Sequence, residues 1–246
     1  MCDYLASDAP AEQHDAHARV TGARPARGAV ITDIDELVAR ARRLARGGRR
    51  MIGIVGPPGG GKSTLARLVA AALGDAAALV PMDGFHLAQS ELVRLGRRDR
   101  MGAPDTFDAA GYVALLARLR ANADAVVYAP EFRREIEEPI AGAIAVPASA
   151  GLVLTEGNYL LLGGGGWEGV RPLLDEVWYV EMDDATRLRW LIERHIAYGK
   201  SPEAAREWVL RSDQANARIV AATRDLADLV VSLPTPAPGA SRDTSR

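Results

Sequence analysis

Cysteine is almost absent from this sequence. The one cysteine among 246 residues, Cys2, cannot form an internal disulfide. A chain without structural disulfides is typical of a reducing compartment, so we expect a cytoplasmic protein. The first residues also lack the basic stretch followed by an apolar one that a secretion signal requires, and we expect no such signal.

Long apolar runs and a strong charge imbalance are lacking as well. No apolar stretch reaches the roughly 18 residues that a membrane-spanning helix needs. The formal net charge is −2, which gives no general basis for binding nucleic acid or an acidic membrane surface. We therefore expect neither a membrane nor a nucleic acid as a partner. Aromatic residues are few, but a hydrophobic content of 48% suffices for a packed core.

Hydrophobic periodicity divides the chain into three parts. Residues 1–28 are polar and alanine-rich, and residues 234–246 are rich in proline and serine, so we predict a disordered tail at each end. Residues 29–233 alternate short apolar runs with helical patterns, which predicts an α/β fold with a mostly parallel sheet and helices on both faces. The predicted strands cover residues 51–55, 78–82, 126–128, 152–156, 176–182 and 228–233.

A glycine-rich turn follows the first of these strands and matches the pattern G-x-x-x-x-G-K-[ST]. Glycines let successive backbone N–H groups point at phosphate oxygens, and the next helix adds its positive N-terminal end. In this pattern Lys62 can reach the β- and γ-phosphates, and Ser63 can bind Mg²⁺. We therefore predict a site for ATP and Mg²⁺. Its nucleotide-binding residues are Gly56, Pro57, Pro58, Gly59, Gly60, Gly61, Lys62, Ser63 and Thr64.

Three classes of protein use such a loop. A GTPase normally shows an N-K-x-D element, and a motor or transport ATPase normally shows further signature segments; neither is found. A kinase needs only the loop, an acid for the metal, a base near the acceptor hydroxyl and cations over the transferred phosphoryl group. Candidates for all four are present, so we favour a small-molecule kinase. The alternative is an ATP-binding regulatory or scaffold module with weak turnover.

Two acidic residues lie at strand ends. Asp83 follows the predicted strand 78–82, and Glu156 closes the strand 152–156. Ligands of parallel α/β sheets bind at the carboxyl ends of the strands, so both side chains are expected to face the phosphates. We assign Asp83 as the catalytic base and Glu156, with Ser63, to Mg²⁺. The alternative is that Asp83 caps a helix that begins near Leu87.

The order of these segments resembles a known family. The pieces GPPGGGKST, MDGFHL, APDTFD, VYAPEFRREIEEP, LTEGNYLL and ATRDLADLVV are similar to the uridine kinase, phosphoribulokinase and bacterial pantothenate kinase superfamily, in its nucleoside/nucleotide kinase-like branch. The resemblance spans roughly residues 30–233 and implies a three-layer P-loop NTPase sandwich. It implies that Asp83 is the catalytic aspartate and that Glu156 supports Mg²⁺. The stretch 128–138 lacks the Y-D-H-type signature of uridine kinases and phosphoribulokinases, which argues against those two substrates.

The same resemblance indicates an acceptor site. Segments that line it in related enzymes carry His86, Tyr128, Arg133 and Asn158 here, so we expect these residues to contact the acceptor. His86 can instead pack beside the loop. Arg133 and Arg134 are adjacent, so only one is expected to face inward, and we choose Arg133. A further arginine cluster is either a solvated surface, which we favour, or an anion site; it consists of Arg94, Arg97, Arg98 and Arg100.

The segment RLRWLIERHIAYGKS at 187–201 resembles the arginine-bearing lid of the family. Arg194 is the first choice for stabilising the transferred phosphoryl group, with Lys200 next, whereas Arg187 and Arg189 are expected on a solvated face. We predict transfer from ATP to a hydroxyl of a nucleoside, a pantothenate-like compound or a sugar. The choice of acceptor, the preference for ATP over GTP and the oligomeric state, a homodimer included, stay open.

Overall fold

The computed structural model describes residues 29–232, and both predicted tails lie outside this part of the chain. The strands are β1 (Ala29–Ile31), β2 (Arg50–Val55), β3 (Ala77–Pro81), β4 (Val126–Arg133), β5 (Glu138–Pro147), β6 (Leu152–Gly157), β7 (Glu176–Val180) and β8 (Leu229–Val231). The α-helices are α1 (Ile34–Leu44), α2 (Lys62–Leu73), α3 (Gln89–Arg94), α4 (Ala109–Ala121), α5 (Asp184–Ala197), α6 (Pro202–Trp208) and α7 (Gln214–Ala221).

Six strands form one parallel sheet in the order β1-β8-β7-β2-β6-β3. Its central strand β2 is buried from Met51 to Val55, as expected for a parallel strand that is covered on both faces. The predicted α/β architecture is therefore confirmed. Because the strands are parallel, the carboxyl ends of β2, β3 and β6 meet at one edge of the sheet, and the loops that follow them lie together there.

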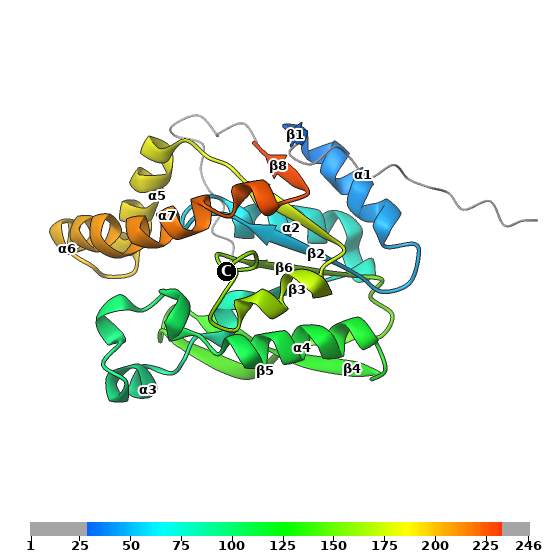
Figure 1. Cartoon of the computed structure of the whole chain (residues 1–246), viewed down its shortest axis with the longest axis horizontal. Helices are drawn as coiled ribbons and strands as arrows, with labels where there is room; N and C mark the ends of the chain where they lie inside the picture. The colour runs from blue at the N-terminus through cyan, green and yellow to red at the C-terminus, as the bar shows by residue number, and fades with distance from the viewer. Residues whose placement is uncertain (1–28, 233–246) are drawn as a thin grey trace, which may run out of the picture.

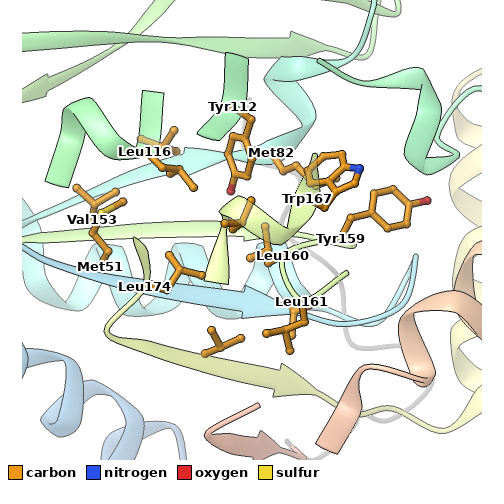
Figure 2. Close-up of a cluster of buried hydrophobic side chains, with 14 of the residues drawn as sticks. Met51, Met82, Tyr112, Leu116, Val153, Tyr159, Leu160, Leu161, Trp167 and Leu174 are labelled. Atoms are coloured by element: carbon orange, nitrogen blue, oxygen red, sulfur yellow. The ribbon is translucent and has the colours of Figure 1, made fainter. Parts of the chain in front are cut away.

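Helices α1 and α2 cover one face of the sheet, where Leu37, Leu65 and Ile54 belong to one cluster of buried apolar side chains. The other face carries α4 and a larger cluster of apolar side chains (Figure 2). Tyr112 and Trp167 are fully buried in that cluster. Within residues 29–232, no helix combines the length and the apolar character that crossing a membrane requires.

The strand predicted at residues 126–128 does not join the parallel sheet. It begins β4, which pairs with β5 in a separate antiparallel hairpin, whose pairing shifts between Ala129 and Glu131 (Figure 1). Only one face of the hairpin is buried, so exposed and buried side chains alternate along β4. Neither β5 nor the short strand β1 is among the strands that the sequence predicts.

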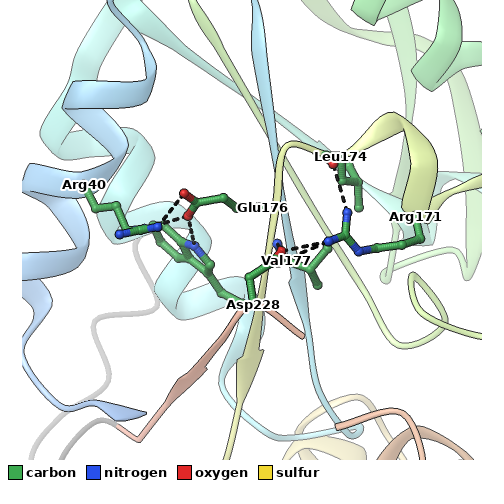
Figure 3. Close-up of polar contacts among 7 residues, drawn as sticks. Arg40, Arg171, Leu174, Glu176, Val177 and Asp228 are labelled. Carbon is green, nitrogen blue, oxygen red and sulfur yellow. Dashed lines mark hydrogen bonds and ion pairs between the residues drawn. The ribbon is translucent and has the colours of Figure 1, made fainter. Parts of the chain in front are cut away.

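Two buried carboxylates secure the amino-terminal end of β7 (Figure 3). Glu176 accepts hydrogen bonds from Arg40 of α1, at 2.6 and 2.7 Å, and from the indole of Trp178 at 2.9 Å. Asp228 accepts from Arg171 at 3.0 Å and from the backbone of β7 at 2.8 Å. These bonds satisfy charges that would otherwise be costly to bury, so the helix on one face is tied to the sheet.

We expect Arg40→Ala to lower the free energy of unfolding by about 2–3 kcal/mol, because the buried carboxylate of Glu176 then loses its cationic partner. Chemical denaturation measures this. The matched control is Arg43→Ala, which removes an exposed arginine from the same helix and should change the stability by less than about 0.5 kcal/mol. Equal effects of the two changes would show that the ion pair contributes nothing to stability.

Candidate active site

The glycine-rich loop connects β2 to α2 as predicted. Gly59 and Gly61 adopt φ angles of 75° and 88°, which favour glycine. A Cβ atom on Gly59 would also lie 2.6 Å from Cγ of Leu191, so helix α5 packs directly against the loop. Helix α2 begins at Lys62, and its positive N-terminal end faces the space that the loop encloses.

Lys62 and Ser63 lie at the base of the cleft that this loop borders. The ammonium of Lys62 is buried and donates to the carbonyl of Pro57 at 3.0 Å. Burial lowers the pKa of Lys62, although the charges of Glu156 and Asp83 oppose that effect. A buried lysine between two carboxylates is suited to hold an anionic phosphate chain.

Ser63 and Glu156, the residues predicted to bind Mg²⁺, are in direct contact. The Ser63 hydroxyl donates to Oε1 of Glu156 at 2.7 Å. Burial, and after it the charge of Asp83, raises the pKa of Glu156. A divalent cation next to this carboxylate would favour its ionised form. Hydroxyl and carboxylate oxygens are ligands that Mg²⁺ prefers, together with water and substrate phosphates, so these residues fit Mg²⁺ bound with ATP.

Asp83 lies in a turn of 3₁₀-helix that directly follows β3. Its Oδ2 accepts a hydrogen bond from Nη2 of Arg134 at 3.1 Å. Burial alone would raise the pKa of Asp83, but His86 and the cations Arg134 and Lys62 reverse this and lower it, so the carboxylate is ionised at neutral pH. Asp83 does not cap the next helix: α3 begins at residue 89, and the first N–H of α3 donates to the carboxylate of Glu138 instead.

His86 and Asn158 both line the cleft, as expected. The Nδ1 atom of His86 donates to the backbone carbonyl of Asp83 at 2.8 Å, which leaves Nε2 as a hydrogen-bond acceptor. Burial lowers the pKa of His86, so its ring is neutral at pH 7. The ring also packs between Phe107 and Phe132, with centroid distances of 4.0 and 4.5 Å. His86 therefore packs beside the loop and also borders the cleft, and its contact with an acceptor stays a prediction.

Tyr128 does not reach the cleft, contrary to our expectation. Its side chain is 61% exposed on the outer face of the hairpin. Its neighbours Val127 and Ala129 are buried on the inner face. Successive side chains of a strand point to opposite faces, so burial of these two residues directs Tyr128 to solvent.

Arg133 was also placed wrongly, and Arg134 takes the position expected for it. Arg133 is exposed and pairs with Glu131, two residues back on the same face of β4. Phe132, between them, points to the cleft. Arg134 follows in the turn of the hairpin, where its side chain reaches Asp83.

The lid segment supplies the opposite wall of the cleft. Arg194 and Lys200 both line it. Burial, and then the charge of Arg134, lowers the pKa of Arg194, and Asp83 is among the charges that act on it. The ammonium of Lys200 lies 4.8 Å from the ring centre of Trp208, where a cation–π contact holds it. Both cations of the segment 187–201 thus border the cleft that Asp83 also lines.

A polar pair on the same wall is not predicted by the sequence. His195 Nε2 lies 2.8 Å from a carboxylate oxygen of Asp213, and both residues line the cleft. Asn216 donates to the carbonyl of Gly102 at 3.2 Å, which links α7 to the segment after α3. Asp213 ends a π-helical turn, Val209–Asp213, between α6 and α7. Such a turn has no simple sequence signature, so the position of Asp213 could not be predicted.

Arg187 is buried, although we expected it on a solvated face. It donates through Nη1 to the carbonyl of Pro58 at 3.3 Å, through Nε to Asp184 at 2.9 Å and through Nη2 to Gln214. This arginine thus ties the glycine-rich loop to α5 and α7. A signal for it was present, because residues 187, 191 and 194 lie on one face of a helix and position 191 is apolar.

Comparisons with known proteins identify relatives of this chain. No family model matches the chain. The chain is 32% identical over 213 residues to the Schizosaccharomyces pombe protein named "Putative uridine kinase C227.14", a match that covers 82% of this chain and 91% of that protein. It is 30% identical over 150 residues to the pantothenate kinase of Limosilactobacillus reuteri, of which it spans about half, 48%.

A solved structure shows the same architecture. The crystal structure of a "putative fructose transport system kinase" from Silicibacter sp. TM1040 has a TM-score of 0.74 and 34% sequence identity. The match covers 81% of this chain and 99% of that chain. The correspondence thus extends over nearly all of the part that the structure describes.

We expect Arg187→Met to lower the free energy of unfolding by about 2–4 kcal/mol, because buried oxygens of Pro58 and Gln214 lose their donor. ATP affinity should fall with it, since the loop loses its tie to α5. Thermal denaturation and calorimetric titration measure the two effects. Arg189→Met is the control, because Arg189 is half exposed and lies 4.0 Å from Glu193 in a surface ion pair. A normal ATP affinity in a destabilised Arg187→Met protein would limit this arginine to a stabilising role.

Proposed function

This chain belongs to the uridine kinase and pantothenate kinase superfamily of P-loop kinases, and we propose that it transfers the γ-phosphoryl group of ATP to a hydroxyl group of a small acceptor. One observation carries the proposal. The ionised Asp83 borders the same cleft as Lys62 of the loop and Arg194 of the lid. A nucleotide-binding module without turnover has no need of such a carboxylate next to its phosphate site.

The cleft residues Lys62, Ser63, Asp83 and Glu156 each have a role in this transfer. The backbone of the loop and Lys62 hold the triphosphate. Ser63 and Glu156 would hold Mg²⁺, which neutralises phosphate charge when bound. Asp83 positions the acceptor hydroxyl and receives its proton. The bond from the γ-phosphorus to the bridging oxygen breaks as the bond to the acceptor oxygen forms, and ADP leaves.

Arg194 completes the site from the lid. Its guanidinium can contact oxygens of the phosphoryl group in flight, and such contacts are strongest in a dry site. Arg187 and Leu191 lie on the same helical face and bind that helix to the glycine-rich loop. The lid cation is thereby positioned relative to the phosphates. The alternative function, a regulatory or scaffold module, has no observation in its favour that kinase activity leaves unexplained.

Asp83→Asn tests the catalytic assignment. It keeps the size of the side chain but removes the base, so we expect kcat to fall by about 10²–10⁴-fold while ATP affinity changes little. ADP formation is followed with uridine, pantothenate and fructose as acceptors, one from each expected class. Asp99→Asn, which alters an exposed aspartate, is the control and should behave like the unaltered protein. Failure of every acceptor to stimulate ADP formation, together with an unchanged slow ATP turnover in Asp83→Asn, would favour the regulatory alternative.

Arg194→Ala and Lys200→Ala separate the two lid cations. We expect Arg194→Ala to lower kcat by roughly 10²–10³-fold, because it removes charge stabilisation in the transition state, with little change in ATP affinity. Lys200→Ala should cost less than about tenfold, since its ammonium is engaged by Trp208. Steady-state kinetics and nucleotide titration on both variants decide the assignment. The reverse order of effects would transfer the role to Lys200.

A further inference from the structure

The acceptor side of the cleft holds a cation, Arg134, that binding of the triphosphate does not require. Lys62 and Arg194 serve the triphosphate in the function proposed above. Arg134 enters from the turn of the β4–β5 hairpin, on a different wall from the loop and the lid. Arg134, Lys62 and Arg194 all line the cleft. Because Lys62 and Arg194 serve the triphosphate, Arg134 is available for an additional anion.

The contact between Arg134 and Asp83 can be exchanged at little cost. The two side chains are 40% and 30% exposed, and their atoms are 3.1 Å apart. Ion pairs with this exposure contribute little to stability, because water and salt screen them. Arg134 can therefore turn from Asp83 to an anion on an incoming ligand. That movement would also free the Asp83 oxygen to receive a hydroxyl group.

A second arginine lies on the same wall. Arg98 lines the cleft and donates to Glu137 of the hairpin turn and to Gln89, at 2.9 Å each. It belongs to the arginine cluster for which the sequence left open a surface or an anion site. The other three members form surface ion pairs: Arg94 with Glu91, and Arg97 and Arg100 with Asp105.

The rings at the cleft already have partners. His86 packs between Phe107 and Phe132, and cations lie against the ring of Trp208. Binding a nucleobase by stacking would require an open aromatic face. Among the cleft-lining residues that the structure describes, charge is therefore more available than stacking surface.

We propose that the acceptor carries a carboxylate or a phosphate group, which Arg134 binds while the hydroxyl of the acceptor lies at Asp83. A guanidinium binds either kind of oxyanion through paired hydrogen bonds, and Arg98 adds a second positive charge on this wall. The inference rests on the proposed kinase function, since it assigns the acceptor to the same cleft. It narrows the acceptor to hydroxy acids and phosphorylated hydroxy compounds.

Matched pairs of an anion and its neutral analogue test this inference. The protein is saturated with Mg²⁺ and a non-hydrolysable ATP analogue, then titrated calorimetrically with D-glycerate and glycerol, pantothenate and pantothenol, fructose 6-phosphate and fructose, and UMP and uridine. We expect the anionic member of at least one pair to bind roughly tenfold or more tightly than its neutral analogue. The carboxylate and phosphate pairs distinguish the two kinds of anion. ADP formation with ATP is measured for the same compounds.

Arg134→Gln and Arg133→Gln supply the variant and its matched control. Arg134→Gln should weaken binding of the anion by roughly 10- to 100-fold and leave affinity for the ATP analogue unchanged. Arg133→Gln alters the neighbouring exposed arginine and should bind the anion normally. Partial rescue by Arg134→Lys would show that charge, and not shape alone, is required.

The remaining outcomes distinguish failure of the anion-site inference from failure of the proposed kinase function. The inference is overturned if the neutral analogues bind as tightly as the anions, if no anion binds, or if both glutamine variants behave alike. Phosphorylation of a neutral acceptor would overturn the anion-site inference but would support the kinase function. Anion binding through Arg134 without any stimulated ADP formation would leave the anion site in place and contradict the kinase function.

Discussion

The parallel pairing of β2 with β6, and of β6 with β3, is the constraint on which the active site depends. In this register Glu156 lies beside Ile54 on one side and Pro81 on the other. The glycine-rich loop, Glu156 and the turn that holds Asp83 therefore leave the sheet at the same edge. A slip of one residue in either pair would turn the side chains of one strand to the opposite face and separate Glu156 from Ser63. The apolar side chains on both faces hold this register, because each strand has a defined buried set.

Because these segments leave the sheet at the same edge, side chains of opposite charge lie together there and offset the cost of burying each other. Lys62 and Glu156 are buried, and each would be costly alone, but their opposite charges lie at the same strand ends. Asp83 stays ionised because cations from the loop and the hairpin face it. The cleft is thus built to receive more negative charge, which a triphosphate supplies. The exposed contact between Arg134 and Asp83 differs from the buried ones, because it can change partners without disturbing the fold.

The lid is coupled to the loop through one face of α5. Leu191 packs on Gly59, and Arg187 donates to the carbonyl of Pro58. Figure 1 shows α5, α6 and α7 together at the end of the molecule where α3 also lies. The bond from Asn216 to Gly102 joins these two groups of elements across the cleft. Movement of the lid would therefore shift residues on the acceptor side of the cleft as well as those at the phosphate site.

The sequence by itself determined the nucleotide loop, the strands of the parallel sheet other than β1, and the two acidic residues at strand ends. These features are local: a glycine pattern needs no distant partner, and a strand that is buried on both faces is apolar throughout, as in β2. The face that a single side chain takes was decided only by tertiary structure. Arg134 and not Arg133 reaches Asp83, because pairing with β5, including its shift after Ala129, sets the orientation of β4. Likewise, Asp213 lies next to His195 because α6 and the π-helical turn bring the chain back toward α5. No local sequence pattern predicts such a contact between two separate segments.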